Sequence, residues 1–326
     1  MQTAPRRKLS DLFNRHEIAL LTERSDWAGW RAILFTWGVI ALCFVLLAWQ
    51  PHPLMWLAVL AVLGGRQLSL AILMHDAAHG TLFKRRWLNE ALADYVCGSP
   101  INVDIKRYKR HHLIHHSKTG TGEDTDLSLA APFPTTRASL ARKFLRDLCG
   151  ISGLKREYGL LLMHLGLLRW TVANDIERLP QQGRRWHDYA RDAARNMWKY
   201  LAFHAVLLGV LAAAGHAWLY LAWVGAYLTT YGLYMRIRSM AEHACTEQST
   251  DMLRNTRTTR AGLLARATVA PLRVNFHIEH HLMPAVPYHR LPAMHAMLRA
   301  RGAVQAPPGY LDVLRLVCKR EEKIAT

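Results

Sequence analysis

The clearest pattern along the chain is a set of four long apolar stretches separated by more polar segments. A helix that crosses the hydrocarbon core of a bilayer needs about 20 residues, with a range of about 17–25. The four stretches have about this length and contain few charged residues; they lie at residues 32–49, 54–74, 198–214 and 217–235. The pattern therefore predicts four membrane-spanning helices.

The four predicted helices pair into two hairpins, because only a few residues separate the members of each pair. Pro51, His52 and Pro53 interrupt the first pair, and Gly215 and His216 interrupt the second. A single helix through the second pair would be about 54 Å long at about 1.5 Å per residue. That length far exceeds a hydrocarbon core of about 30 Å, so we predict a tight turn in each pair.

The distribution of basic residues sets the predicted orientation. The chain has 326 residues, is 51% hydrophobic and carries a formal net charge of +18. Such a charge fits either a nucleic-acid binder or a membrane protein with basic cytoplasmic surfaces. The two turns contain no Lys or Arg, whereas the other helix ends carry Arg24, Arg31, residues 84–86, Arg191, Arg195, Lys199, Arg236 and Arg238. Basic flanks stay cytoplasmic, so both turns are predicted outside and both termini inside. Because the charges follow this membrane topology and not one motif, we expect no nucleic-acid partner.

The expected fold class is therefore an all-α integral membrane protein with a cytoplasmic helical cap over the four helices. We expect a single domain over residues 1–326, with a cytoplasmic segment at 1–31 and a cap formed by residues 75–197 and 236–326. The shorter apolar segments at 87–101 and 157–170 are expected to be helices, either at the membrane interface or within the cap. Five scattered cysteines form no CxxC pair, so no disulfide framework or thiolate metal site is indicated.

Histidines cluster on the predicted cytoplasmic side, in "HDAAH" (75–79), "HHLIHH" (111–116) and "HIEHH" (277–281). Residues at i, i+3 and i+4 share one face of a helix, so each cluster presents its imidazoles in one direction. Four ligands satisfy a structural zinc site, whereas the clusters supply eight and His243 makes a ninth. The candidates are His75, His79, His112, His115, His116, His243, His277, His280 and His281. This number predicts two metal ions, and imidazole suits Zn, Cu, Fe or Ni.

The other histidines are expected to be structural or solvated: His16, His52, His164, His187, His204, His216, His289 and His295. His111 adjoins a cluster but lies outside its spacing, and its role stays open. Ligating histidines usually donate their second ring N–H to a carboxylate or carbonyl. The candidate partners are Asp76, Asp126, Glu242, Asn275 and Glu279, with Asp104, Glu123 and Asp124 also nearby. About half of these acids could equally be ordinary solvated side chains.

The three clusters resemble the three histidine boxes of the membrane fatty-acid desaturases and hydroxylases. "RIRSMAEHA" (236–244) resembles the segment that supplies an additional histidine in that family, and "GEDTDL" (122–127) resembles its acidic stretch. The resemblance extends from about residue 30 to about 295. It implies a cofactor of two Fe ions that activates O2 with external electrons and removes hydrogen from an unactivated C–H bond. The implied iron ligands are the nine candidate histidines.

The short first box and the last box "NFHIEHH" look more like those of acyl-lipid desaturases than those of the acyl-CoA type. We therefore expect an acyl-lipid desaturase of the bacterial inner membrane that takes its lipid substrate from the bilayer. A hydroxylase, ketolase or decarboxylase on the same scaffold is the nearest alternative. A zinc-dependent membrane hydrolase or a receptor-like protein is an alternative from a different class.

Electrons must come from a separate carrier, because the sequence has no haem motif, CxxC pair or GxGxxG loop. We therefore expect no bound haem or flavin and an external donor of the ferredoxin or cytochrome b5 type. The basic run "KRYKR" (106–110) could dock such an acidic carrier, or it could attract anionic lipid head groups.

Overall fold

The first two apolar stretches form long helices, because a backbone in lipid must satisfy its own hydrogen bonds. In the computed structural model, which describes residues 9–170 and 176–318, these helices are α3 (Asp26–Trp49) and α4 (Pro53–Ala78). Ser25 caps the start of α3, and His52 Nδ1 accepts a hydrogen bond from the backbone N–H of Leu54 at the start of α4. The predicted turn between the two helices is confirmed.

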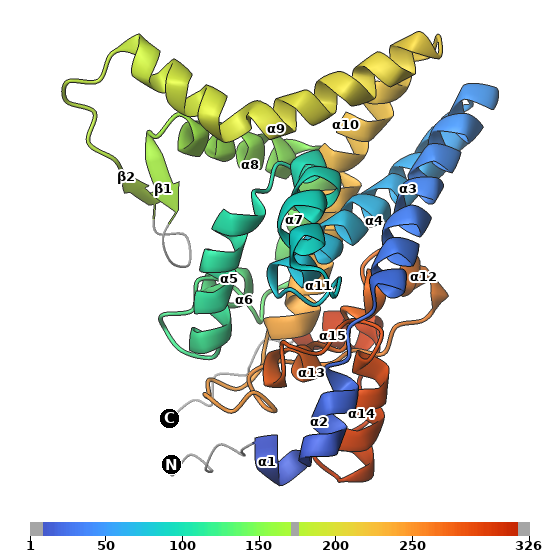
Figure 1. Ribbon diagram of the computed structural model, residues 1–326, viewed down its shortest axis with the longest axis vertical. Coiled ribbons are helices and arrows are strands. Elements are labelled where there is room, and N and C mark those ends of the chain that lie inside the picture. Colours follow the sequence, from blue (N-terminus) through green and yellow to red (C-terminus); the bar gives the residue numbers. More distant parts are fainter. Residues whose placement is uncertain (1–8, 171–175, 319–326) are drawn as a thin grey trace.

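The second hairpin is less regular than expected. Its first helix, α9 (Trp186–Ala213), begins twelve residues before the predicted span, and Figure 1 shows its two halves running in different directions. The predicted fourth span is divided among η4 (Ala217–Leu219), α10 (Tyr220–Leu228) and α11 (Thr230–His243). Within the described residues, three helical segments are long and apolar enough to cross a membrane: residues 15–49, which include α3, and the helices α4 and α9.

The break between α10 and α11 has a local cause. Thr229 has φ −113° and ψ −88°, outside the helical region. Its hydroxyl donates to the carbonyl of Gly225, and the hydroxyl of Thr230 donates to the carbonyl of Leu60 on α4, both at 2.6 Å. Threonine hydroxyls that bond to backbone carbonyls compete with regular helix geometry. A contact with α4 therefore fixes the place where the fourth apolar stretch is interrupted.

Helix α4 lies at the centre of the molecule and packs against α3, α5, α10 and α11 (Figure 1). From Leu63 to Ala78 every residue is buried. Small residues allow the close packing: a Cβ added at Gly64 would lie 2.2 Å from Thr230 Oγ1, and one at Gly65 would lie 2.3 Å from the carbonyl oxygen of Ala267. The buried end of α4 carries His75 into the cap.

Helices make up most of the cap. Between α4 and α9 lie the π-helices η1 (Leu88–Leu92) and η2 (Asp94–Gly98), the 3-10 helix η3 (Ser99–Ile101), α5 (Ile105–Lys118), α6 (Leu127–Ala130), α7 (Arg137–Leu148) and α8 (Ile151–His164). The remaining cap elements are α12 (Leu263–Ala267), η5 (Pro271–Arg273), α13 (His277–Leu282), α14 (Leu291–Ala300) and α15 (Tyr310–Val317), while α1 (Leu9–Leu12) and α2 (Arg15–Leu21) precede α3. The chain is thus mainly helical, as expected.

The apolar segment 157–170 is only partly helical. Helix α8 ends at His164, and β1 (Leu168–Trp170) then pairs antiparallel with β2 (Ile176–Arg178). Gly166 has a positive φ of 68°, which reverses the chain after the helix and ends the helical pattern. Figure 1 shows the two hairpin turns at one end of the molecule and α1, α2, α13 and α14 at the other.

Candidate metal centre

Four helices bring the three histidine boxes and His243 together. Helix α4 ends beside His75 and His79, α5 carries the second box, α11 ends at His243 and α13 begins with the third box. The side chains of His79 and His243 are half-buried and the other seven are buried. All nine candidate ligands therefore lie inside the cap, in two groups.

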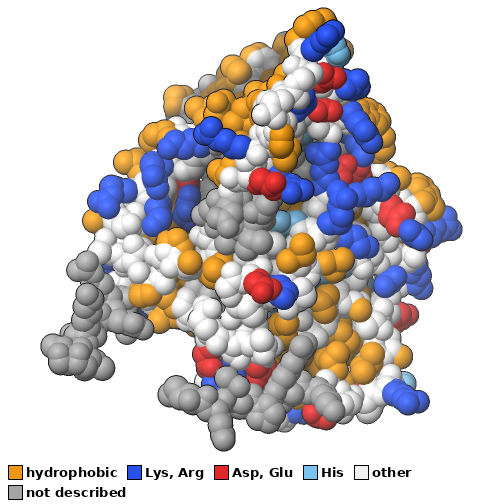
Figure 2. All heavy atoms as spheres, turned by 90° about the vertical axis from the view of Figure 1, so that its left-hand side faces the viewer, with side chains coloured by type: hydrophobic (Ala, Val, Ile, Leu, Met, Phe, Trp, Pro, Cys, Tyr) orange, Lys and Arg blue, Asp and Glu red, His pale blue; other side chains and the backbone are white. Residues whose placement is uncertain are grey.

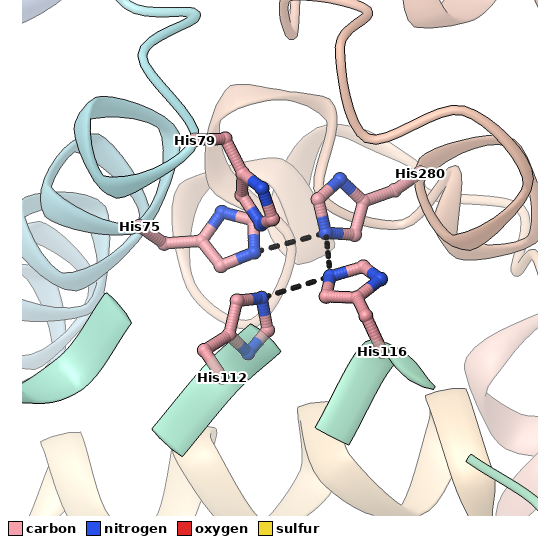
Figure 3. Close-up of side chains that lie close together, drawn as sticks. All are labelled: His75, His79, His112, His116 and His280. Atoms are coloured by element: carbon pink, nitrogen blue, oxygen red, sulfur yellow. Dashed lines mark hydrogen bonds between the residues drawn. The ribbon is translucent and has the colours of Figure 1, made fainter. Parts of the chain in front are cut away.

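The first group, the five-histidine site, contains His75, His79, His112, His116 and His280, whose nearest ring nitrogens lie within 4.8 Å of one another. Figure 3 shows the five rings facing a common centre. Three Nε2–Nε2 distances, from His280 to His75, from His280 to His116 and from His116 to His112, are each 3.0 Å. Two nitrogens bound at right angles to one ion at about 2.1 Å would be about 3.0 Å apart.

The second group, the four-histidine site, contains His115, His243, His277 and His281. The Nε2 atoms of His277 and His243 are 2.8 Å apart. His281 Nδ1 lies 3.4 Å from the hydroxyl of Thr119, which leaves its Nε2 free for the site. Because His115 and His116 are adjacent on α5, and His280 and His281 are adjacent on α13, the two sites are neighbours.

The protonation of these imidazoles fits metal binding better than a hydrogen-bonded network. Burial lowers the pKa of His116 to about 2, and burial with neighbouring histidines holds the pKa of His112, His280 and His281 well below its usual value. Burial also lowers the pKa of His115, but the hydrogen bond with Asp124 and nearby carboxylates outweigh it and raise that pKa. A neutral imidazole has one N–H, so His280 Nε2 cannot hydrogen-bond fully to both His75 Nε2 and His116 Nε2, whereas a shared metal ion would satisfy all three nitrogens.

Unpartnered ring nitrogens support the same interpretation. Within the described part of the chain, His79 Nε2 and His281 Nε2 are buried without a hydrogen-bond partner. The buried Nδ1 atoms of His116 and His277 also lack one, but it is the Nε2 atoms of these two rings that face other ligands. Native proteins pair most buried polar atoms, and a bound ion is one reason for an exception. The residues thus fit two transition-metal ions with nitrogen ligands.

Two carboxylates contact candidate ligands directly. Asp76 Oδ1 lies 2.9 Å from His75 Nδ1, and Asp124 Oδ1 lies 2.7 Å from His115 Nδ1. Such contacts fix the tautomer and aim the opposite nitrogen at the metal. The main partner of Asp126 is His111, whose Nε2 lies 3.2 Å from Asp126 Oδ1. The other carboxylate oxygen of Asp126 lies 3.8 Å from His115 Nδ1.

Glu242 holds a different position. Its carboxylate pairs with Arg238 at 2.8 Å and lies 3.7 Å from His277 Nδ1. Burial raises the pKa of Glu242 to about 7, while Arg238 acts in the opposite direction. Arg238 was expected only as a basic residue at a helix end, whereas its half-buried side chain pairs with a carboxylate beside the four-histidine site.

The two candidate partners near the third box, Asn275 and Glu279, contact neighbouring segments of the cap and not a candidate ligand ring. Glu279 accepts a hydrogen bond from Thr258 Oγ1 and pairs with His295 Nδ1, both at 2.6 Å. Asn275 donates to the carbonyl of Thr259 at 2.7 Å. These contacts attach α13 to α14 and to the loop before it. Asp104 and Glu123 lie away from the histidines, at the start of α5 and beside Lys118.

Tyr108 was not among the expected site residues. Its ring stacks on His112, with centroids 5.0 Å apart, and also lies near His75. The spacing of four residues on α5 places Tyr108 on the same helix face as His112, so the signal was present in the sequence. Tyr108 forms part of the wall between the five-histidine site and a large cavity.

This cavity has a volume of about 950 Å³ and lies among α5, α8 and α9. Apolar side chains line much of it, together with the cations of Arg107, Arg110, Arg169 and Lys199 and one carboxylate, that of Asp104. Figure 2 shows Lys and Arg side chains gathered on the face of the molecule that carries α5, β1 and β2. We refer to the cavity of about 950 Å³ as the α5 cavity.

A family model described as fatty acid desaturase matches residues 51–311. The chain belongs to the fatty acid desaturase family. This membership confirms the resemblance and makes the chain an oxidoreductase, and with the three long apolar helices it indicates a membrane protein.

Similar desaturases come from bacteria and an animal. The chain is 28% identical over 285 residues to a dihydrorhizobitoxine desaturase of Bradyrhizobium elkanii, covering 85% of this chain and 75% of that protein. It is 28% identical over 264 residues to the Delta(5) fatty acid desaturase fat-4 of Caenorhabditis elegans, covering 75% of this chain and 57% of the relative. It is 22% identical over 313 residues to an sn-1 oleoyl-lipid 12-desaturase of Synechocystis, covering 90% and 84%.

Proposed function

We propose that this desaturase-family chain is an O2-dependent membrane enzyme that removes two hydrogens from the acyl chain of a lipid. The observation that carries the proposal is the grouping of nine buried or half-buried histidines into adjacent sites of five and four. Two bound iron ions would supply the oxidising chemistry needed for an unactivated C–H bond.

The protein's own part in this chemistry is to hold and orient the ligands. Asp76 and Asp124 each accept the Nδ1 proton of a histidine and leave Nε2 for the metal. Tyr108 stacks on His112 and limits the movement of that ring. The buried pair of Arg238 and Glu242 places one balanced charge pair beside the four-histidine site.

For the membrane arrangement, we propose four crossings within one domain, with both termini and the cap in the cytoplasm of a bacterium and the helices in its inner membrane. Helices α10 and α11 together would supply the fourth crossing. The absence of Lys and Arg from the two turns supports this orientation, since basic residues favour the cytoplasmic side. The change of direction within α9 would let its first half lie along the cap.

The α5 cavity supports a substrate with an acidic polar end. Arg107 contacts the amide of Asn196, and neither Arg107 nor Arg110 has a carboxylate partner among the described residues, whereas Lys199 pairs with Asp94 and Arg169 with Glu177. Two guanidinium groups without a carboxylate ion-pair partner among the described residues, beside an apolar wall, suit a carboxylate or phosphate joined to a hydrocarbon. Because Tyr108 lines the cavity and stacks on His112, such a substrate would lie next to the five-histidine site.

A smaller acidic molecule is a second candidate substrate. The α5 cavity lies between the cap helices α5 and α8 and the first half of α9, and charged side chains line it, so a water-soluble acid would have access to it. One relative is named for dihydrorhizobitoxine and not for a fatty acid. Hydroxylation, ketone formation and decarboxylation remain alternative outcomes at the same site, and in each case electrons would come from an external ferredoxin or cytochrome b5-type carrier.

The test is a mass-spectrometric comparison of lipids and soluble acids from bacteria that express the wild type, His280→Ala or His52→Ala. We expect an unsaturated product and about two irons per purified chain in the wild type and in His52→Ala, but not in His280→Ala. One zinc per chain without an oxidised product would refute the proposal in favour of a hydrolase. Oxygenated products would keep the iron site and change the reaction class.

A further inference from the structure

A second, smaller cavity lies where the start of α3 meets the chain that follows α13. Its volume is about 280 Å³. It is lined by Glu23, Arg24, Ser25, Ala28, Arg31, Lys84, His289 and Arg290. None of these residues belongs to the histidine sites or the α5 cavity, so the cavity needs an explanation of its own. We refer to it as the α3 cavity.

The α3 cavity carries an excess of positive charge. Four cations and one carboxylate line it, and Arg290 already pairs with Glu23 at 2.5 Å. In the part of the chain that the structure describes, Arg24, Arg31 and Lys84 have no carboxylate within ion-pair distance. The positive end of the α3 helix dipole is already opposed by Asp26 in its first turn, which accepts the backbone N–H of Lys84 and pairs with Arg85, so the excess charge comes from the side chains of Arg24, Arg31 and Lys84. Cations held together without counter-charge favour binding of an anion.

One imidazole nitrogen and one guanidinium nitrogen of residues that line the cavity lack hydrogen-bond partners. His289 Nδ1 and Arg290 Nε are buried, and neither has a hydrogen-bond partner among the described residues. Leaving a buried polar group unsatisfied costs about 1–3 kcal/mol. An acceptor oxygen in the cavity would satisfy Arg290 Nε, and His289 could donate from a neutral ring. The cavity therefore has hydrogen-bonding capacity as well as charge.

The position of the cavity indicates the source of the anion. Arg31 directly precedes the apolar residues 32–49, and Trp27 is 72% exposed on the same turn region, as expected for a residue at a membrane interface. The phosphates of bilayer lipids lie at this depth. Tyr288, next to His289, donates to the carbonyl of Ala28 at 3.0 Å and so holds the cap against α3.

We propose that the α3 cavity binds an anionic phosphate group, supplied by the head group of a bilayer phospholipid. The bound phosphate joins Arg24 and Lys84 from the membrane-helix side to His289 and Arg290 from the cap. It thereby stabilises the segment that follows the third histidine box. This role does not depend on the reaction that the enzyme catalyses.

The experiment uses the full chain, purified in detergent and stripped of lipid. Its thermal midpoint is measured by intrinsic fluorescence while phosphatidylglycerol, phosphatidylcholine or inorganic phosphate is added. The test variant is Arg24→Gln with Lys84→Gln, which removes two exposed cations without an ion-pair partner. The matched control is Arg142→Gln with Arg299→Gln, which removes two exposed arginines on α7 and α14 that have no ion-pair partner among the described residues and do not line the cavity.

We expect phosphatidylglycerol to raise the midpoint of the wild type and the control, and to require at least tenfold higher concentration in the test variant. Equal responses of the test and control variants would overturn the site. So would equal stabilisation by phosphatidylglycerol and zwitterionic phosphatidylcholine. Stabilisation by inorganic phosphate alone at similar concentrations would support the phosphate chemistry and overturn its lipid source.

Discussion

The Nδ1 atom of His115 lies 2.7 Å from Oδ1 of Asp124, and both side chains are buried. Asp124 also accepts the backbone N–H of Asp126 at 2.8 Å, which fixes the carboxylate in place. The contact directs His115 Nε2 toward His243 and His281, whose rings lie 4.9 and 5.0 Å from that of His115. The carboxylate of Asp124 thus orients one of the four candidate ligands of the four-histidine site.

Asp124→Asn should weaken metal binding at the four-histidine site. Asparagine keeps the shape but removes the charge, and loss of such a partner typically costs about 10–100-fold in metal affinity. We expect iron content to fall toward one ion per chain after dialysis against a chelator, measured by mass spectrometry. Glu123→Gln is the control, since Glu123 is exposed and, among the described residues, forms its ion pair with Lys118. Equal iron retention in both variants would contradict the role of Asp124.

His295→Ala should destabilise the third histidine box although His295 lies outside it. The substitution removes one of the two partners of Glu279, which is fully buried, and so costs about 1–3 kcal/mol. We expect a lower thermal midpoint and reduced metal content, with partial recovery in His295→Gln. His16→Ala, on the exposed face of α2, should change neither. Normal metal content in His295→Ala would show that α13 does not need this contact.

Gly64→Ala should disrupt the packing of α4 against α11. The new Cβ would lie 2.2 Å from Thr230 Oγ1, and overpacking of this kind costs about 1–3 kcal/mol. We expect less folded protein after mild heating in detergent, measured by size-exclusion chromatography. Gly38→Ala on α3 is the control, because no atom lies within 4 Å of its Cβ. A loss of equal size in both variants would point to a general effect on helix insertion.

His52→Ala should leave product formation unchanged. His52 lies in the turn between α3 and α4, at the end of the molecule opposite the histidine sites (Figure 1). Among the described residues its side chain accepts a hydrogen bond from the backbone N–H of Leu54, so we expect a stability loss of about 0.5–2 kcal/mol, in the range of other helix caps. Thermal midpoint and product yield are measured on the same membranes. A large loss of product would contradict the proposed arrangement.

Arg107→Gln with Arg110→Gln should impair binding of an acidic substrate. Both guanidinium groups face the α5 cavity, so we expect KM to rise at least tenfold while iron content stays constant. Lys106→Gln with Lys155→Gln removes the same charge from exposed positions outside the cavity and serves as the control. An unchanged KM in the arginine variant would place the acidic group elsewhere, or show that the substrate has none.

Local sequence patterns predicted the parts of this molecule that depend on composition and spacing. Apolar length located α3 and α4 and the last half of α9, and Pro51 and Gly215 marked the two turns. Helix-face spacing grouped the histidines of each box, whereas the charge-based assignment of the boxes to the cytoplasmic side stays a prediction. The structure brings these boxes together at distances that suit two metal sites.

Features that depend on contacts between distant residues could not be predicted in this way. The break at Thr229 needs the carbonyl of Leu60, which is 170 residues from Thr230. The pairing of Glu279 with His295 needs α14 to fold back on α13, and nothing in the spacing of either residue indicates it. The division of nine histidines into five and four likewise depends on how α4, α5, α11 and α13 cross.

The Nε2 contact between His75 and His280 joins residues 205 positions apart. An ion shared by such residues would act as a cross-link that closes a very long loop, and the unfolded chain loses much conformational freedom when such a loop is closed. Two ions would link four helices from both halves of the chain. The free energy of metal binding would then add to the free energy of unfolding. Iron supply during synthesis would therefore decide how much of this protein survives proteolysis.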